Sequence, residues 1–114
     1  MHDDLARHRT IDLTTFGRKS GEARRIEIWW FRIDGRFVIT GTPGRRDWLA
    51  NIRANPNVTI HVAGRDIPAL ATPIGDPEVR RAVFTDASTS WYTTQEELDR
   101  LVATSPMVEI TFVE

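Results

Sequence analysis

The chain has 114 residues, of which 40% are hydrophobic and 27% are charged, which is ordinary usage for one globular domain and excludes disordered and collagen-like classes. No apolar run is long enough to span a bilayer, and the polar residues at the start do not resemble a secretory signal. The absence of cysteine excludes disulfides and thiolate metal sites, so we expect a cytoplasmic protein. The length of the chain predicts a single domain over residues 1–114.

The net charge of −1 hides an uneven distribution of charge along the chain. Residues 1–65 carry 12 basic and 7 acidic side chains, whereas residues 66–114 carry 3 basic and 9 acidic ones. A cationic half attracts small anions even when the whole protein is nearly neutral. RNA binding is a further alternative, against which the acidic second half and the net charge of −1 argue; it would use Arg18, Lys19, Arg24, Arg25, Arg45 and Arg46.

The first half of the chain is typical of strands joined by tight turns. Strands are predicted over residues 11–16, 24–33 and 36–42. Ile26, Ile28 and Trp30 are expected to share one face of the second strand, and Asp34-Gly35 is a hairpin signal. A short helix is predicted over residues 47–54, with Asp47 as its N-cap.

The second half mixes strands with helices. Strands are predicted over residues 57–63, 65–72 and 107–113, the first with Val58, Ile60 and Val62 pointing inward. Asp76-Pro77 opens a second helix, and a capping box of Thr94 and Glu97 opens a third. The predicted order is β-β-β-α-β-β-α-α-β, a mainly β (α+β) fold in which an antiparallel sheet curls into a small barrel with short flanking helices.

A glycine-flanked basic turn is the first candidate binding site. Gly17 and Gly21 allow a tight backbone turn, while Arg18, Lys19 and Ser20 supply cations and a hydroxyl. Together with Arg24 these groups suit a phosphate or a carboxylate. Basic hairpin turns that only face solvent are also common, so composition alone leaves this alternative open.

The predicted helix after the third strand holds the second candidate site. Arg45 and Arg46 precede it, and the positive end of the helix dipole adds to their attraction for an anion. Helical spacing places Trp48 and Asn51 on one side. The alternative is that Trp48 belongs to the core and that Asn51 satisfies a nearby backbone group.

Aromatic residues form a third candidate. Trp29, Trp30, Phe31 and Phe37 offer a wall for a planar ring, with core packing as the default role. Tyr92 is the only tyrosine and therefore the only phenol available as a catalytic proton donor. The three histidines lack the spacing of metal ligands, so no metal site is expected.

Two ordered motifs resemble a known family. Residues 13–21, from Leu13 to Gly21, followed by Arg24 and the aromatic strand, resemble the opening of the deazaflavin (coenzyme F-420)-dependent nitroreductase and quinone reductase family. Residues 48–58 are similar to the W-x-x-N-x-x-A-N-P-x-V signature of that family. The resemblance implies a split β-barrel of the flavin-reductase-like superfamily and an oxidoreductase that passes hydride to a quinone, an enone or a nitro compound.

The resemblance also implies roles for individual residues. Arg18, Lys19, Ser20 and Arg24 would meet the phosphate of coenzyme F-420 and the start of its oligoglutamate tail, and Thr40, Gly41, Thr42, Trp48 and Asn51 would lie around the cofactor. We add Arg45 and Arg46 on grounds of charge, for the acidic tail. FMN in the same groove and a non-catalytic carrier of a cofactor or lipophilic ligand remain the alternatives. Split barrels occur both as homodimers and alone, so the assembly stays open.

Overall fold

The strands of the protein form one curled antiparallel sheet. The computed structural model describes residues 3–113. The strands are β1 (Thr10–Phe16), β2 (Ala23–Trp29), β3 (Phe31–Ile33), β4 (Arg36–Thr40), β5 (Asn57–Val62), β6 (Arg65–Pro73) and β7 (Met107–Phe112), in the sheet order β2-β1-β5-β6-β7-β4-β3. The helices are α1 (Asp47–Ala54), α2 (Pro77–Thr85), α3 (Ser90–Thr93) and α4 (Leu98–Thr104), with short 3₁₀ turns at Asp3–Arg7 and Ala87–Thr89. The expected mainly β (α+β) split barrel with short flanking helices is confirmed.

A single residue closes the barrel. Trp30 joins β2 to β3, yet these two strands lie at opposite edges of the sheet, so the sheet must curl until its edges meet. The backbone N–H of Trp30 donates to the carbonyl of Arg9, and the indole Nε1 donates to the carbonyl of His8 at 2.6 Å. The prediction of one continuous strand over residues 24–33 is therefore wrong at Trp30, because closure of the sheet breaks the strand there.

The sheet separates two apolar cores. Trp30, Leu13 and Ile60 pack inside the barrel, whereas Phe31 and Val38 pack on the other face beneath the helices. Neighbouring residues along a strand point to opposite faces, so Trp30 and Phe31 belong to different cores although they are adjacent in sequence. The predicted inward positions Val58, Ile60 and Val62 are all buried in the barrel core, and that prediction is confirmed.

The helix ends agree with the sequence only in part. Asp76 is the N-cap of α2, its carboxylate accepts the backbone N–H of Glu78, and Pro77 occupies the first helical position, as predicted. Asp47 is not an N-cap, because α1 already begins at Asp47 and Arg46 holds the cap position. The capping box is also wrong: Thr94 donates to the carbonyl of Trp91 at the end of α3, and α4 begins later, at Leu98.

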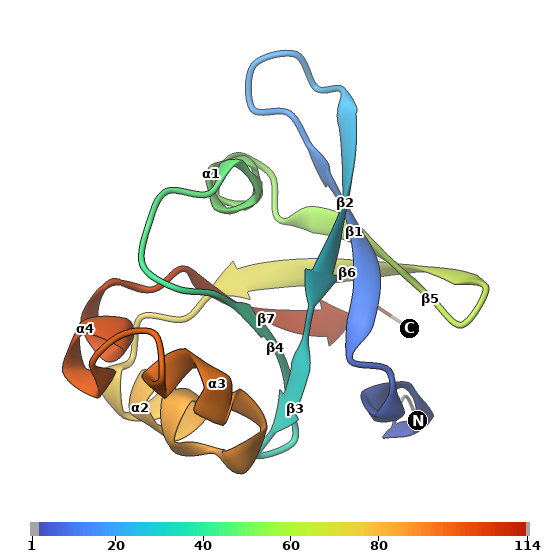
Figure 1. Cartoon of the computed structure of the whole chain (residues 1–114). Helices are drawn as coiled ribbons and strands as arrows, with labels where there is room; N and C mark the ends of the chain where they lie inside the picture. Colours follow the sequence, from blue (N-terminus) through green and yellow to red (C-terminus); the bar gives the residue numbers. More distant parts are fainter. Residues whose placement is uncertain (1–2, 114) are drawn as a thin grey trace.

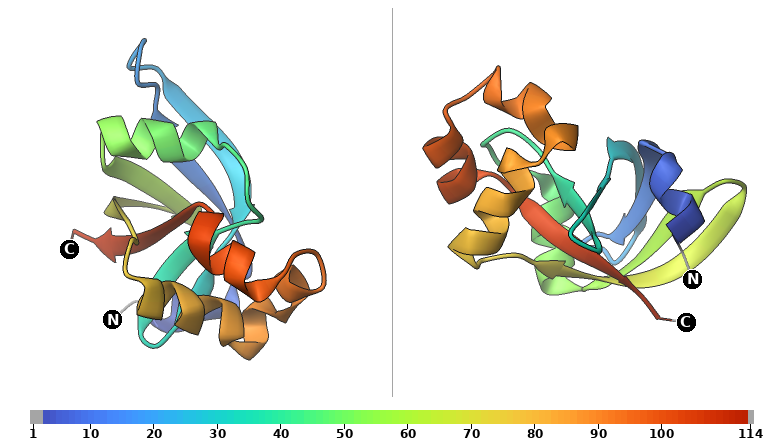
Figure 2. Two further views of the ribbon diagram at one scale, coloured as in Figure 1. Left: turned by 90° about the vertical axis from the view of Figure 1, so that its left-hand side faces the viewer. Right: turned by 90° about the horizontal axis from the view of Figure 1, so that it is seen from below.

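The helices occupy two separate positions around the barrel (Figures 1 and 2). Helices α2, α3 and α4 gather on one side of the sheet and cover the outer core. Helix α1 lies apart from them, beside the long β1–β2 hairpin, whose turn projects beyond the rest of the fold. This arrangement leaves a concave surface between α1 and the hairpin.

Candidate functional site

A groove of about 510 Å³ lies between helix α1 and the β1–β2 hairpin. Residues far apart in sequence meet in it because β1 turns back into β2 opposite the side of α1 that carries Trp48 and Asn51. Its lining residues are Thr15, Gly17, Arg18, Lys19, Ser20, Arg24, Ile26, Asp47, Trp48 and Asn51. The basic turn and the Trp48–Asn51 pair, which the sequence suggested as two candidates, therefore belong to one cavity.

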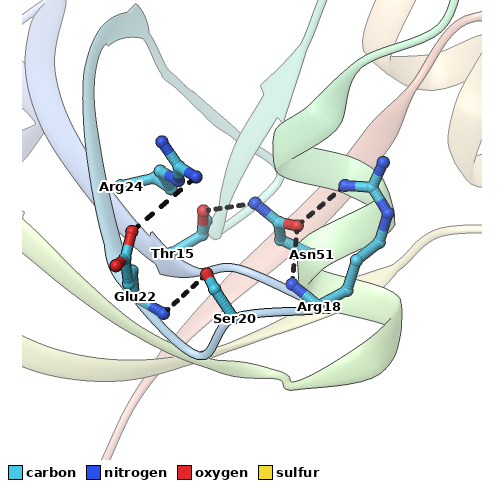
Figure 3. Close-up of polar contacts among 6 residues, drawn as sticks. All are labelled: Thr15, Arg18, Ser20, Glu22, Arg24 and Asn51. Atoms are coloured by element: carbon cyan, nitrogen blue, oxygen red, sulfur yellow. Dashed lines mark hydrogen bonds and ion pairs between the residues drawn. The ribbon is translucent and has the colours of Figure 1, made fainter.

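Asn51 connects the two walls of this groove (Figure 3). Its side chain is 4% exposed, and its Oδ1 accepts from the backbone N–H of Arg18 at 3.2 Å and from Arg18 Nη1 at 3.0 Å. Its Nδ2 donates to Thr15 Oγ1 at 3.3 Å. The carboxamide thus uses its acceptor for the turn and its donor for β1, which fixes α1 against the hairpin.

Two glycines shape the basic turn. The N–H of Gly17 donates to the carbonyl of Glu22, and the N–H of Gly21 donates to the carbonyl of Gly17, both at 2.8 Å. Gly21 has a φ of +73°, a left-handed conformation in which a side chain is strained. A Cβ on Gly17 would lie 2.8 Å from Ser20 Oγ, which accepts the backbone N–H of Glu22. Both glycines are therefore required by the turn itself, although Gly21 does not line the groove.

The groove combines cations with an apolar wall. Arg18 approaches Asp47 at 3.7 Å, and Arg24 approaches Glu22 at 4.0 Å, but these contacts are long and largely solvent-exposed. Such pairs hold their cations weakly, so the guanidinium groups remain available to a stronger anion. Trp48, which also packs into the barrel core, and the half-exposed Ile26 supply apolar surface.

Gly41 and Thr42, which the sequence also predicted to lie around the cofactor, contact Arg46 and do not line the groove. Arg46 Nη2 donates to the carbonyl of Thr42 at 2.9 Å, and a Cβ on Gly41 would lie 3.1 Å from the same nitrogen. Thr40 is buried and its hydroxyl donates to the carbonyl of Pro106 at 2.6 Å. Thr40 therefore holds β4 to the segment before β7.

Tyr92 is buried in the outer core. Its ring makes edge contacts with Phe31, Phe84 and Trp91, and the side chain is 5% exposed. Burial raises the pKa of the Tyr92 phenol, and the positive charges of Arg46 and Arg9 oppose this rise. The structure does not place Tyr92 in the lining of the groove, so its catalytic role stays a prediction.

Arg45 and Arg46 line a different cavity. This cavity, of about 790 Å³, lies on the other side of α1, where Leu49, Ala50 and Arg53 replace Trp48 and Asn51 as lining residues. The sequence analysis placed Arg45, Arg46, Trp48 and Asn51 in one candidate site because they are neighbours in the chain. The helix separates them, since residues 48 and 51 face the hairpin and residues 49, 50 and 53 face α4.

The aromatic wall is mostly core. Trp30 stacks on Phe37 at a ring distance of 4.3 Å inside the barrel, and Phe31 lies beneath the helices. Trp29 is 41% exposed and meets Trp91, 50% exposed, edge to face at 6.0 Å. Of the aromatic set, only Trp29 is thus available to a ligand.

Sequence reasoning missed three residues of the groove: Thr15, Ile26 and Asp47. Ile26 was assigned to a strand face, but nothing in the sequence showed that this face leaves the barrel and borders α1. Thr15 lies two residues before Gly17, and this nearness to the basic turn was the available signal. Among residues 3–113 no group of three or more histidine or carboxylate side chains could hold a metal ion. Within the same residues no helix has the length and the apolar character that are needed to cross a membrane.

The donor set of the groove suits a ligand with an anionic end and a flat apolar body. Arg18, Lys19 and Arg24 supply charge at one end, Ser20 supplies a hydroxyl beside them, and Ile26 and Trp48 supply apolar surface. A deazaflavin carries a planar ring and a phosphate, so the residues present fit this group.

Solved structures with the same architecture include redox proteins. An F420-H2 dependent reductase (FDR-A) is 19% identical, with a TM-score of 0.66, over 90% of this chain and 94% of that one. A putative pyridoxamine 5'-phosphate oxidase from Listeria innocua is 13% identical, with a TM-score of 0.70, over 96% and 88% of the two chains. A FAD-binding protein from Mesorhizobium loti is 18% identical, with a TM-score of 0.67, over 96% and 85%. At these identities the likeness establishes the fold.

The family follows from the sequence match rather than from the fold. Residues 3–107 match the family model described as F420H(2)-dependent quinone reductase. The match covers both motifs, the groove and the helices that cap the outer core. The chain belongs to the F420H(2)-dependent quinone reductase family, a family of oxidoreductases.

Proposed function

We propose that the protein binds reduced coenzyme F-420 in the groove between α1 and the β1–β2 hairpin and reduces an electron-poor organic acceptor. The observation that carries the proposal is the convergence of Arg18, Lys19 and Arg24 with Ile26 and Trp48 in one cavity. The family match supports the cofactor class.

The cations and the asparagine have separate roles in this proposal. Lys19 and Arg24 hold the phosphate by charge, and Arg18 adds a guanidinium whose direction Asn51 fixes. Trp48 and Ile26 exclude water from one face of the ring. A cofactor held at its anionic end by a rigid turn has one orientation, which positions its reactive face for the acceptor.

The bound deazaflavin supplies a hydride, and the protein supplies binding and orientation. A quinone, an enone or a nitro compound accepts hydride because it is electron-poor. Tyr92 remains our proposed proton donor, since the chain has no other tyrosine and the positive charges of Arg46 and Arg9 act to lower the pKa of its hydroxyl.

FMN is the second candidate cofactor, because the fold is shared with a FAD-binding protein. A non-catalytic carrier is the third candidate and differs in that it binds without turnover. A homodimer and a cytoplasmic location remain predictions of the same proposal.

The proposal is tested by titrating oxidised and reduced coenzyme F-420 and FMN into the purified protein, followed by turnover with a panel of quinones. We expect binding of coenzyme F-420, and loss of at least about tenfold in affinity in the Arg18→Gln/Lys19→Gln variant, because two charged contacts to phosphate are removed. The matched control is Arg36→Gln/Arg65→Gln, which removes the same charge outside the groove. Tighter binding of FMN, binding without turnover, or equal loss in both variants would each overturn the proposal.

A further inference from the structure

The cavity on the α4 side of α1 is a concave surface of arginines without acidic residues. We call it the α1–α4 pocket; its lining is Gly44, Arg45, Arg46, Leu49, Ala50, Arg53, Ile74, Gly75, Arg80, Ala103, Thr104, Ser105 and Pro106. Four arginines and no acidic residue thus line a cavity of about 790 Å³. Like charges brought together in a cavity repel one another, which an anion in the cavity relieves.

Arg80 forms a fixed part of this pocket. Its Nε donates to the carbonyl of Val102 at 2.6 Å, its Nη1 to the carbonyl of Ile74 at 2.7 Å, and its Nη2 to the carbonyl of Ser105. These three bonds clamp the end of α4 to the segment before α2. A guanidinium carries five N–H donors, so Arg80 keeps donors and a full charge after all three carbonyls are satisfied.

Ser105 provides an independent observation at the same place. Its side chain is 4% exposed, and its Oγ is buried without a hydrogen-bond partner within the described part of the chain. Buried hydroxyls are nearly always paired, because an unpaired one loses its hydrogen bonds to water and gains none. Ser105 is also among the lining residues of the pocket, so one residue of that lining carries an unpaired hydroxyl.

Arg45 and Arg53 differ from Arg80 in being exposed. Arg53 lies in the last turn of α1, and Arg45 precedes that helix, so the two approach the pocket from different segments. Four arginines in the lining carry more positive charge than one phosphate, with about −1.5 to −2 at neutral pH, neutralises. The arrangement therefore favours an anion with several charged groups.

We propose that the α1–α4 pocket is a second anion site, which takes a small molecule with two or more phosphate or carboxylate groups. The site goes beyond the proposed cofactor groove, because α1 separates the two cavities and no residue lines both. Two sources supply this chemistry: the charged tail of a cofactor held in the groove, or a separate soluble anion.

The site is tested with pyrophosphate and γ-linked triglutamate, titrated into the full chain at constant ionic strength and followed by amide NMR signals of Ala50, Gly75 and Ala103. We expect saturable shifts at these amides, and affinity lower by about tenfold in the Arg45→Gln/Arg53→Gln variant. Arg36→Gln/Arg65→Gln should bind as the wild type does. No saturable shift with either probe, or equal weakening in both variants, would overturn the proposal.

A second arm identifies the source of the anion. The pyrophosphate titration is repeated after saturation of the protein with coenzyme F-420. Competition supports the cofactor tail as the occupant, and simultaneous binding supports a separate anion; either result requires an anion site at the pocket. If coenzyme F-420 does not bind at all, the proposed function is overturned. The second anion site is then still tested by the amide shifts that pyrophosphate causes in the protein without cofactor.

Discussion

The carboxamide oxygen of Asn51 accepts two hydrogen bonds from Arg18, one from the backbone N–H at 3.2 Å and one from the guanidinium at 3.0 Å. One buried side chain on α1 therefore fixes both the turn and the direction of its arginine. The basic turn is held in the shape of a binding site before any ligand arrives, which lowers the entropy that binding must overcome.

Replacement of Asn51 by alanine should loosen the turn and weaken cofactor binding. We expect the free energy of unfolding to fall by about 1–3 kcal/mol, because Arg18 loses its buried acceptor, and the affinity for coenzyme F-420 to fall by about tenfold. Denaturant unfolding and a cofactor titration measure the two effects. Asn51→Asp keeps the acceptor for Arg18 and should retain most of the stability, although its added negative charge in the groove should still weaken anion binding. Equal loss of stability in both variants would contradict a role for this acceptor in holding Arg18.

Trp30 should be the aromatic residue of this chain most sensitive to substitution. Trp30→Phe removes the indole N–H that donates to the carbonyl of His8 and leaves space beside Phe37, so we expect a loss of about 2 kcal/mol in urea unfolding. Trp91→Phe is the matched control, because Trp91 is 50% exposed and its loss should change stability by less than about 0.5 kcal/mol. Similar costs for the two variants would show that Trp30 does not close the barrel.

Asp86 should make stability depend on pH in acid. Hydrogen bonds from the hydroxyl and the backbone N–H of Ser88 lower the pKa of Asp86 below its usual value of 3.8. A lowered folded-state pKa stabilises the protein above the unfolded value, and this contribution disappears as the pH falls through the folded value.

The comparison of wild type with Asp86→Asn checks this sign. Near neutral pH the variant should be less stable by about 0.3–1 kcal/mol, since the amide keeps an acceptor at the start of the 3₁₀ turn but loses the negative charge. The difference in unfolding free energy should shrink steadily as the pH falls below about 4. A difference that stays constant down to the acid limit would refute the assignment.

Removal of the Ser105 hydroxyl should stabilise the protein in the absence of anions. Its Oγ is buried without a partner, so Ser105→Ala should raise the free energy of unfolding by about 1 kcal/mol. Ser88→Ala is the opposite control, because Ser88 Oγ donates to Asp86 at 2.6 Å and its removal should destabilise the fold. Thermal unfolding in a phosphate-free buffer measures both, and destabilisation by Ser105→Ala would show that the hydroxyl is satisfied.

Tyr92→Phe separates a chemical role from a packing role. The phenylalanine ring preserves the contacts with Phe31 and Phe84, so stability and cofactor affinity should change little. If Tyr92 donates the proton, as we propose, kcat should fall by about 100-fold or more. Unchanged turnover of a quinone would remove Tyr92 from the mechanism.

Regular alternation made most of the sheet predictable from the sequence. In β5 every second residue is apolar and buried, and in β7 Val108 and Ile110 are buried and Phe112 is partly buried, so local pattern and burial agree. The break at Trp30 was not predictable in the same way, because Trp29, Trp30 and Phe31 all favour strands. Contact between the two edges of the sheet interrupts the strand there, and this contact is not visible in local sequence.

The same contrast holds for the candidate site. The basic turn was visible because its cations and glycines are consecutive, and the spacing of Trp48 and Asn51 is helical. The hydrogen bonds between Asn51 and Arg18 join residues 33 positions apart, and no periodicity encodes them. The α1–α4 pocket was hidden for the same reason, since Arg53, Arg80 and Ser105 come from three separate elements.

The connection through Trp30 also bears on how the chain folds. The two edges of the sheet are joined by one residue, so bringing them together closes almost no loop and costs little chain entropy. The slow steps should instead be the pairings of β1 with β5, of β6 with β7 and of β4 with β7, whose partners are distant in sequence. Once those pairings form, the two edges of the sheet are already neighbours, and barrel closure follows as a local event.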